Sequence, residues 1–172
     1  MTLALVLSSL VAGLIATTVM LGFLYLPLLW RGVHYDTLAS LGGIVTGRSD
    51  ERSKVIGALL LYLGGLLFAL FYGLALVVLT RGELTVPDYT IFASWPVHIN
   101  VFYVLFGMMM GLAHGAFISL ITLFVVTDFH PVQAQREPFP LLLSYLVGHV
   151  VYGAVAMLLL SVFVPLFSSG TV

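Results

Sequence analysis

The stretch FGMMMGLAHGAFIS, residues 106–119, decides the fold class because it is long, apolar and punctuated by small residues. Gly107, Gly111, Gly115 and Ser119 recur in it at four-residue intervals, which places them on one face of a helix. Helices in lipid associate through such faces, since close packing replaces the hydrophobic drive that operates in water. The stretch therefore predicts a membrane-spanning helix that packs closely against a neighbour.

The composition of the whole chain points to the same class. Of its 172 residues, 61% are hydrophobic and only 8% are charged, whereas a soluble domain carries about a quarter charged residues. Such a chain could not cover a water-facing surface, so we expect a single integral membrane domain over residues 1–172. The net charge of −1 offers no basic field for nucleic acid, and the lack of cysteine excludes disulfides and thiol nucleophiles.

Four apolar runs are long enough to cross a bilayer, which takes about 20 residues as a helix. Lipid cannot satisfy open backbone hydrogen bonds, so each run is expected to be helical. We therefore predict an all-α fold, a transmembrane four-helix bundle. The expected spans cover residues 3–30, 55–80, 99–127 and 140–166.

A faint internal repeat suggests that the bundle consists of two tandem helical hairpins. GLIATTVM (13–20) parallels GLAHGAFI (111–118), and YLGGLLFALFYG (62–73) parallels YLVGHVVYG (145–153). Two hairpins in tandem would have the same orientation in the membrane, which is a parallel repeat. Duplication and chance similarity between apolar segments both remain open at this stage.

The basic residues predict the orientation of the chain. The positive-inside rule places Lys- and Arg-rich short loops in the cytoplasm. We therefore expect the first and third loops inside, and both termini on the non-cytoplasmic side of the inner (plasma) membrane. The first and third loops hold Arg31, Arg48, Arg52, Lys54 and Arg136, and the second holds Arg81.

Two histidines are expected at membrane depth, His114 in the third span and His149 in the fourth. At the rise of an α-helix they lie about 20 Å and about 14 Å from the cytoplasmic ends of their spans, so antiparallel neighbours could bring the rings together. Tyr152 shares the helix face of His149. The three residues are candidates for cofactor binding.

Three interpretations of these histidines are open. Neutral imidazoles could hydrogen-bond across helices as structural glue. They could ligate a b-type haem, with Gly115 and Gly148 leaving room for the macrocycle. They could form a proton or quinone site, since ionisable groups inside a membrane are functional candidates. We expect no cofactor, with haem b as the alternative.

A second cluster of candidates lies at the cytoplasmic ends of the first and third spans. His34 and Asp36 follow the first span, and Asp128 and His130 end the third. Two imidazoles and two carboxylates could bind a borderline divalent metal. The alternative is ordinary helix capping, and Asp36 in particular is expected to cap a short helix, TLASLGGIVTG (37–47).

Small residues also recur in the second span, where Gly65 and Gly73 are candidates for helix packing. These faces and that of residues 106–119 could pack inside the bundle. One of them could instead face outward and bind a partner subunit or a second copy of the chain.

Several segments together resemble a family of small four-helix prokaryotic integral membrane proteins of unknown function. The resemblance implies that His114 and the His149-x-x-Tyr152 pattern belong to the family type, and it implies no activity. The segments are GLIATTVM (13–20), HYDTLASLGGIVTG (34–47), FGMMMGLAHGAF (106–117) and LVGHVVYG (146–153).

No pattern typical of an enzyme is present in the sequence. It has no HExxH, no phosphate loop and no nucleophile elbow, so we expect a non-enzymatic protein. The leading hypothesis is an accessory or scaffold subunit that packs against other membrane subunits, or against its own copy, in the bilayer. The alternatives are a small haem b redox protein using His114 and His149, and a transporter or channel for a small neutral solute.

Overall fold

The structure, a computed structural model, describes residues 3–25, 36–81, 89–94, 97–133 and 138–169. Four of its helices are long and apolar enough to cross a membrane, which confirms the predicted all-α four-helix architecture. The elements are α1 (Leu3–Leu24), α2 (Thr37–Thr46), α3 (Glu51–Arg81), β1 (Thr90–Ser94), β2 (Val97–Asn100), α4 (Val101–Phe129) and α5 (Pro138–Ser169).

The short helix expected in the first loop is present as α2. Its N-cap Asp36 accepts a hydrogen bond from the Ala39 N–H at 2.9 Å, which satisfies one of the free donors of the first turn. Gly47 ends the helix with φ of 68°, and its N–H donates to the Gly43 carbonyl oxygen at 2.8 Å. That left-handed conformation favours glycine.

Two features of the helices and loops differ from the predictions. Helix α3 begins at Glu51 rather than at residue 55, because Asp50 accepts the Ser53 N–H at 2.9 Å and lets the helix start before the apolar run. The second loop contains an antiparallel hairpin of β1 and β2 in place of an irregular connection.

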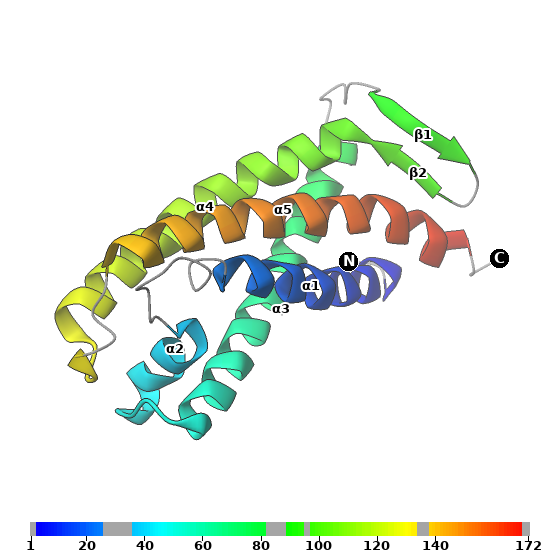
Figure 1. Ribbon diagram of the computed structural model, residues 1–172. Helices are drawn as coiled ribbons and strands as arrows, with labels where there is room; N and C mark the ends of the chain where they lie inside the picture. Colours follow the sequence, from blue (N-terminus) through cyan, green and yellow to red (C-terminus); the bar gives the residue numbers. More distant parts are fainter. Residues whose placement is uncertain (1–2, 26–35, 82–88, 95–96, 134–137, 170–172) are drawn as a thin grey trace.

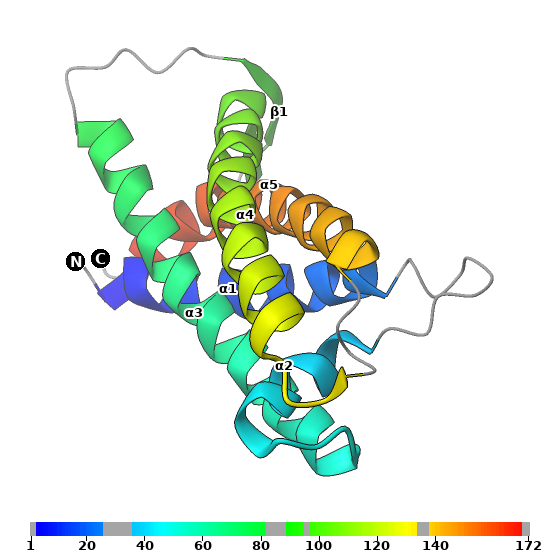
Figure 2. The same ribbon diagram turned by 90° about the vertical axis from the view of Figure 1, so that its left-hand side faces the viewer.

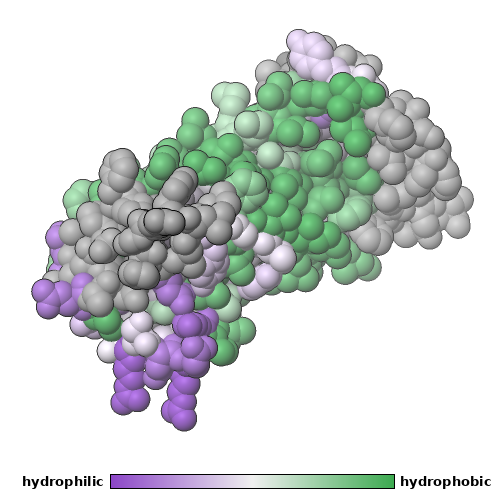
Figure 3. All heavy atoms as spheres, in the orientation of Figure 1, coloured by the Kyte–Doolittle hydropathy of each residue, from purple (hydrophilic) through white to green (hydrophobic). Residues whose placement is uncertain are grey.

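The helices are arranged as two antiparallel pairs, α1 with α3 and α4 with α5 (Figure 1). Helix α1 also lies along α5, while α2 packs on the first turns of α3 (Figure 2). The strands, the start of α1 and the end of α5 lie at one end of the bundle, and α2 lies at the other. Hydrophilic side chains gather at the α2–α3 end, and the middle of the visible face is hydrophobic (Figure 3).

Helices α4 and α5 touch backbone to backbone. A Cβ added at Gly107 would overlap the carbonyl oxygen of Gly153, and one at Gly111 would overlap that of His149. A Cβ at Gly115 would lie 2.6 Å from the Cβ of His149. The predicted small-residue face of α4 therefore packs within the chain, with Ser119 also buried at 2% exposure.

Helices α1 and α3 meet through a matching row of small residues. The hydroxyl of Ser9 lies against Gly73, and that of Thr17 against Gly65. Between them, a Cβ at Gly13 would lie 2.7 Å from the Cβ of Ala69. The predicted packing glycines of the second span are thus covered by the first span.

The contacts of the two hairpins fall at equivalent positions of the internal repeat. Aligning Gly13 with Gly111, and Gly73 with Gly153, maps the Ser9–Gly73 contact onto the Gly107–Gly153 contact. Tandem hairpins with a common origin would produce this equivalence. The symmetry is broken between the hairpins, because α1 packs along α5 whereas α3 and α4 diverge.

Candidate functional site

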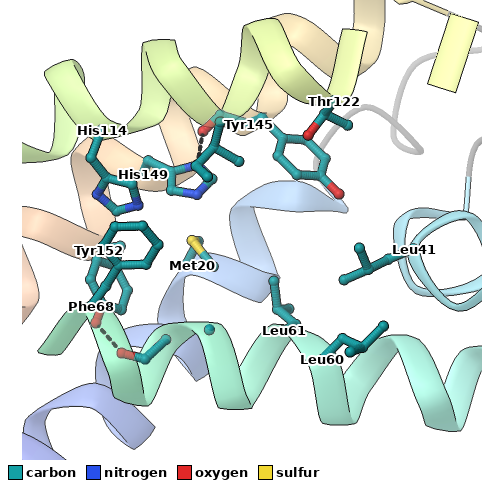
Figure 4. Close-up of a pocket in the computed structure, with 13 residues that line it drawn as sticks. Met20, Leu41, Leu60, Leu61, Phe68, His114, Thr122, Tyr145, His149 and Tyr152 are labelled. Atoms are coloured by element: carbon teal, nitrogen blue, oxygen red, sulfur yellow. Dashed lines mark hydrogen bonds between the residues drawn. The ribbon is translucent and has the colours of Figure 1, made fainter. Parts of the chain in front are cut away.

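A cavity of about 150 Å³ lies where α3 diverges from α4, and we call it the histidine pocket (Figure 4). Both His114 and His149 point into it. The remaining lining is mainly apolar, and α3 contributes the largest share of it. Its members include Met20, Leu60, Gly64, Phe68, Tyr145 and Tyr152.

The two imidazoles lie together, as the depth argument predicted. Their ring centroids are 4.6 Å apart with an interplanar angle of 87°. The packing of α4 on α5 causes this proximity, because Gly111 leaves room for the backbone of His149 and Gly115 leaves room for its Cβ beside the turn that carries His114. A larger residue at Gly115 would separate the rings.

His114 is held by aromatic side chains of α3. Its ring stacks on Phe68 with centroids 3.9 Å apart, and its Nδ1 lies 3.2 Å from the Tyr72 hydroxyl. Its Nε2 is buried and has no hydrogen-bond partner among the residues that the structure describes. A buried polar atom without a partner is costly, so this nitrogen is a candidate for a polar contact with a bound group.

His149 and Tyr152 are fixed by backbone carbonyl groups. The Nδ1–H of His149 donates to the Tyr145 carbonyl oxygen at 2.6 Å. The Tyr152 hydroxyl donates to the Gly65 carbonyl oxygen of α3 at 2.5 Å. Tyr152 also meets Tyr72 edge to face, with centroids 5.7 Å apart, and so joins the two hairpins at the pocket. Tyr152 is therefore satisfied by protein contacts.

Two residues of α3 that line the pocket lie toward the outer face of this helix. Leu60 is 37% exposed, and a Cβ added at Gly64 would meet no atom within 4 Å. In a bilayer this face of a spanning helix borders lipid tails. The pocket thus lies near the lipid-facing side of α3.

The residues do not fit a haem held between His114 and His149. Ligation by both imidazoles would place the iron between the rings and the macrocycle as a plate between α4 and α5. At that level, Gly111 and Gly115 of α4 touch the backbone and Cβ of His149, so no slot exists. The cavity itself is only about the size of one that binds benzene.

The predicted metal cluster is distributed over separate structural roles. His130 is fully buried, its Nε2–H donates to the Ser40 carbonyl oxygen at 2.9 Å, and its Nδ1 accepts the Val132 N–H at 3.0 Å. Asp128 is exposed, and His34 lies outside the described residues. Within the described ranges, no group of three or more His, Asp or Glu is arranged to hold a metal ion.

Asp36, the fourth member of that cluster, ties three elements together. Its carboxylate accepts the Tyr25 hydroxyl at 2.9 Å and lies 3.3 Å from Lys54 Nζ, in addition to capping α2. Partial burial opposes ionisation, but the hydrogen bonds from Ala39, Tyr25 and Lys54 outweigh it and lower the pKa of Asp36. Burial, together with the bond to Asp36, raises the pKa of Tyr25 to about 12. At neutral pH Asp36 is therefore ionised and Tyr25 is protonated, so the hydrogen bond between them is kept.

Sequence reasoning missed Phe68 and Tyr72, which hold His114. The signal was available, because aromatic residues four apart lie on one helix face, the same face as the packing residues Gly65 and Ala69. The sequence pattern does not indicate that α3 crosses α4 at this level, because the crossing depends on tertiary packing.

The fold and the pocket define a class: a four-span helical membrane protein with a histidine-lined cavity between its hairpins. No known protein family, curated protein or solved structure matches the chain.

Proposed function

We propose that this protein binds a small, neutral, lipid-soluble molecule in the histidine pocket. The observation that carries the proposal is the unpartnered Nε2 of His114, buried beside a cavity with a mainly apolar lining. Binding sites commonly combine an apolar wall with a few polar groups that fix the ligand. No Asp, Glu, Lys or Arg lines the pocket within the described residues, which favours an uncharged ligand.

The volume of the pocket limits the size of the bound group. A cavity of about 150 Å³ is comparable to an engineered protein cavity that accepts benzene. The bound part of the ligand is therefore about one six-membered ring, and any longer tail would lie between α3 and α4 toward the lipid.

The accessory-subunit hypothesis has less support from the described residues. The small-residue faces that suggested it, including Gly107, Gly111 and Gly73, pack against helices of the same chain. Transport of a small neutral solute is compatible with a ligand pocket, since binding is its first step. We propose no catalytic activity and no haem.

Filling the pocket tests the proposal. A leucine at Gly64 is expected to fill part of the cavity, because Gly64 lines it and an added Cβ there meets no atom within 4 Å. We expect Gly64→Leu to weaken the binding of fluorobenzene at least tenfold, measured by ¹⁹F NMR on protein in lipid nanodiscs. Gly22→Leu is the matched control, since Gly22 is also an open helical glycine and does not line the pocket. Equal binding to both variants and to the unmodified protein would refute the proposal.

We further propose that the protein lies in the inner (plasma) membrane with both termini outside. The support is the excess of Lys and Arg in the first and third loops. The chain has no cysteine, so single cysteines can report the side. An impermeant maleimide added to intact cells is expected to label Ile91→Cys in the β hairpin, and Arg52→Cys only after lysis. The reverse pattern would overturn the orientation.

A further inference from the structure

We infer that the ligand of the histidine pocket carries a hydroxyl group on its ring, as a phenol does. The inference rests on the proposed binding function and deepens it by naming the chemical class. It follows from which ring nitrogens carry protons, and the neighbouring hydrogen bonds determine that.

His149 offers an acceptor to the pocket. Its Nδ1 lies 2.6 Å from the Tyr145 carbonyl oxygen, which can only accept, so Nδ1 carries the proton. In a neutral imidazole the other nitrogen is then unprotonated. The Nε2 of His149 therefore presents a lone pair.

His114 offers a donor. Its Nδ1 lies 3.2 Å from the Tyr72 hydroxyl, which has no other hydrogen-bond partner in the described part of the chain. If Nδ1 carried the proton, the Tyr72 hydroxyl proton and the His114 Nε2 would both lack partners. If Tyr72 donates to Nδ1 instead, only the His114 Nε2–H is left over, which is the less costly arrangement in an apolar site.

A hydroxyl group complements this pair. A hydroxyl oxygen placed between the two rings, whose centroids are 4.6 Å apart, would accept the Nε2–H of His114 in place of the packing that now buries this atom, and would donate its own proton to the Nε2 of His149. An ether or ketone oxygen can accept but not donate, and an apolar ring can do neither. The mainly apolar walls and the cavity volume fit the rest of a single ring.

The experiment compares three ring-sized probes by ¹⁹F NMR in lipid nanodiscs: 4-fluorophenol, 4-fluoroanisole and fluorobenzene. Binding to Gly64→Leu serves as the baseline for partition of each probe into lipid. We expect the phenol to bind about five- to tenfold more tightly than the anisole, as the added hydrogen bond to His149 requires. The comparison uses the unmodified protein, so it does not depend on any histidine variant folding.

The His149→Asn variant tests the assigned partner. Asparagine can keep a donor near the Tyr145 carbonyl oxygen but lacks the Nε2 acceptor. We expect the phenol-to-anisole ratio to fall below about twofold, while fluorobenzene still binds. If all three probes bind the unmodified protein equally and Gly64→Leu weakens them all, the hydroxyl inference is wrong and the pocket proposal stands. If Gly64→Leu changes none of them, both are wrong.

Discussion

Replacing Gly153 with alanine is expected to destabilise the bundle by about 2–3 kcal/mol, because the new methyl group has no room. A Cβ there would overlap the Gly107 carbonyl oxygen and lie 3.0 Å from the Cα of Gly111. Both are backbone atoms of α4 and cannot rotate away. The helices α4 and α5 would have to separate along their whole small-residue contact, which also sets the spacing of His114 and His149.

The free energy of unfolding can be measured by SDS titration in mixed micelles. Gly22→Ala is the matched control, because Gly22 lies in a spanning helix and an added Cβ there meets nothing within 4 Å. Its higher helix propensity, worth up to about 1 kcal/mol in water, should leave it neutral or slightly stabilised. If Gly153→Ala is as stable as Gly22→Ala, the backbone contact between α4 and α5 is not as close as described.

The architecture of the bundle was largely predictable from the sequence, because lipid imposes simple rules on length and spacing. Gly107, Gly111 and Gly115 at four-residue intervals predicted a close helix contact, and Asp36 predicted the start of α2. The chain positions alone did not determine which helix would cover each face. Glycines at four-residue intervals are equally suited to a contact within the chain and to a contact with a partner. The fold shows that these glycines pack within the chain.

The candidate site was predictable in part. The depths of His114 and His149 predicted that the rings could meet, and they do. Tyr72 was missed because its role depends on the angle at which α3 crosses α4. The tautomers, and hence the donor and acceptor in the pocket, depend on bonds to Tyr72 and to the Tyr145 carbonyl oxygen that no spacing rule gives.

The β hairpin was missed for a different reason. In residues 90–100, TIFASWPVHIN, only VHIN (97–100) alternates β-branched with polar residues, and four positions are too few for a period of two to stand out. The hairpin also lies between two much longer apolar runs, the second and third spans. A two-stranded hairpin depends on its surroundings for stability, so its own sequence carries only a weak signal.

Replacing His130, a candidate metal ligand in the sequence, is expected to reduce stability about as much as replacing Gly153. Its imidazole is fully buried and bridges the end of α4 to the Ser40 carbonyl oxygen of α2. Gly43 leaves the space for the ring, since a Cβ there would lie 3.1 Å from the His130 Cε1. His130→Ala would leave a cavity and remove the partners of Ser40 and of the Val132 N–H, a loss of about 3 kcal/mol.

Two companion variants separate the causes of that loss. His130→Phe keeps a ring in the space but donates no hydrogen bond, so it should recover only part of the stability. Phe129→Ala changes the neighbouring residue, which is 75% exposed, and is expected to cost less than about 0.5 kcal/mol. Hydrogen exchange of the α2 amides should accelerate in His130→Ala and not in Phe129→Ala, because the His130 side chain, unlike that of exposed Phe129, is hydrogen-bonded to α2. Unchanged exchange in both variants would mean that α2 is held by its contacts with α3 alone.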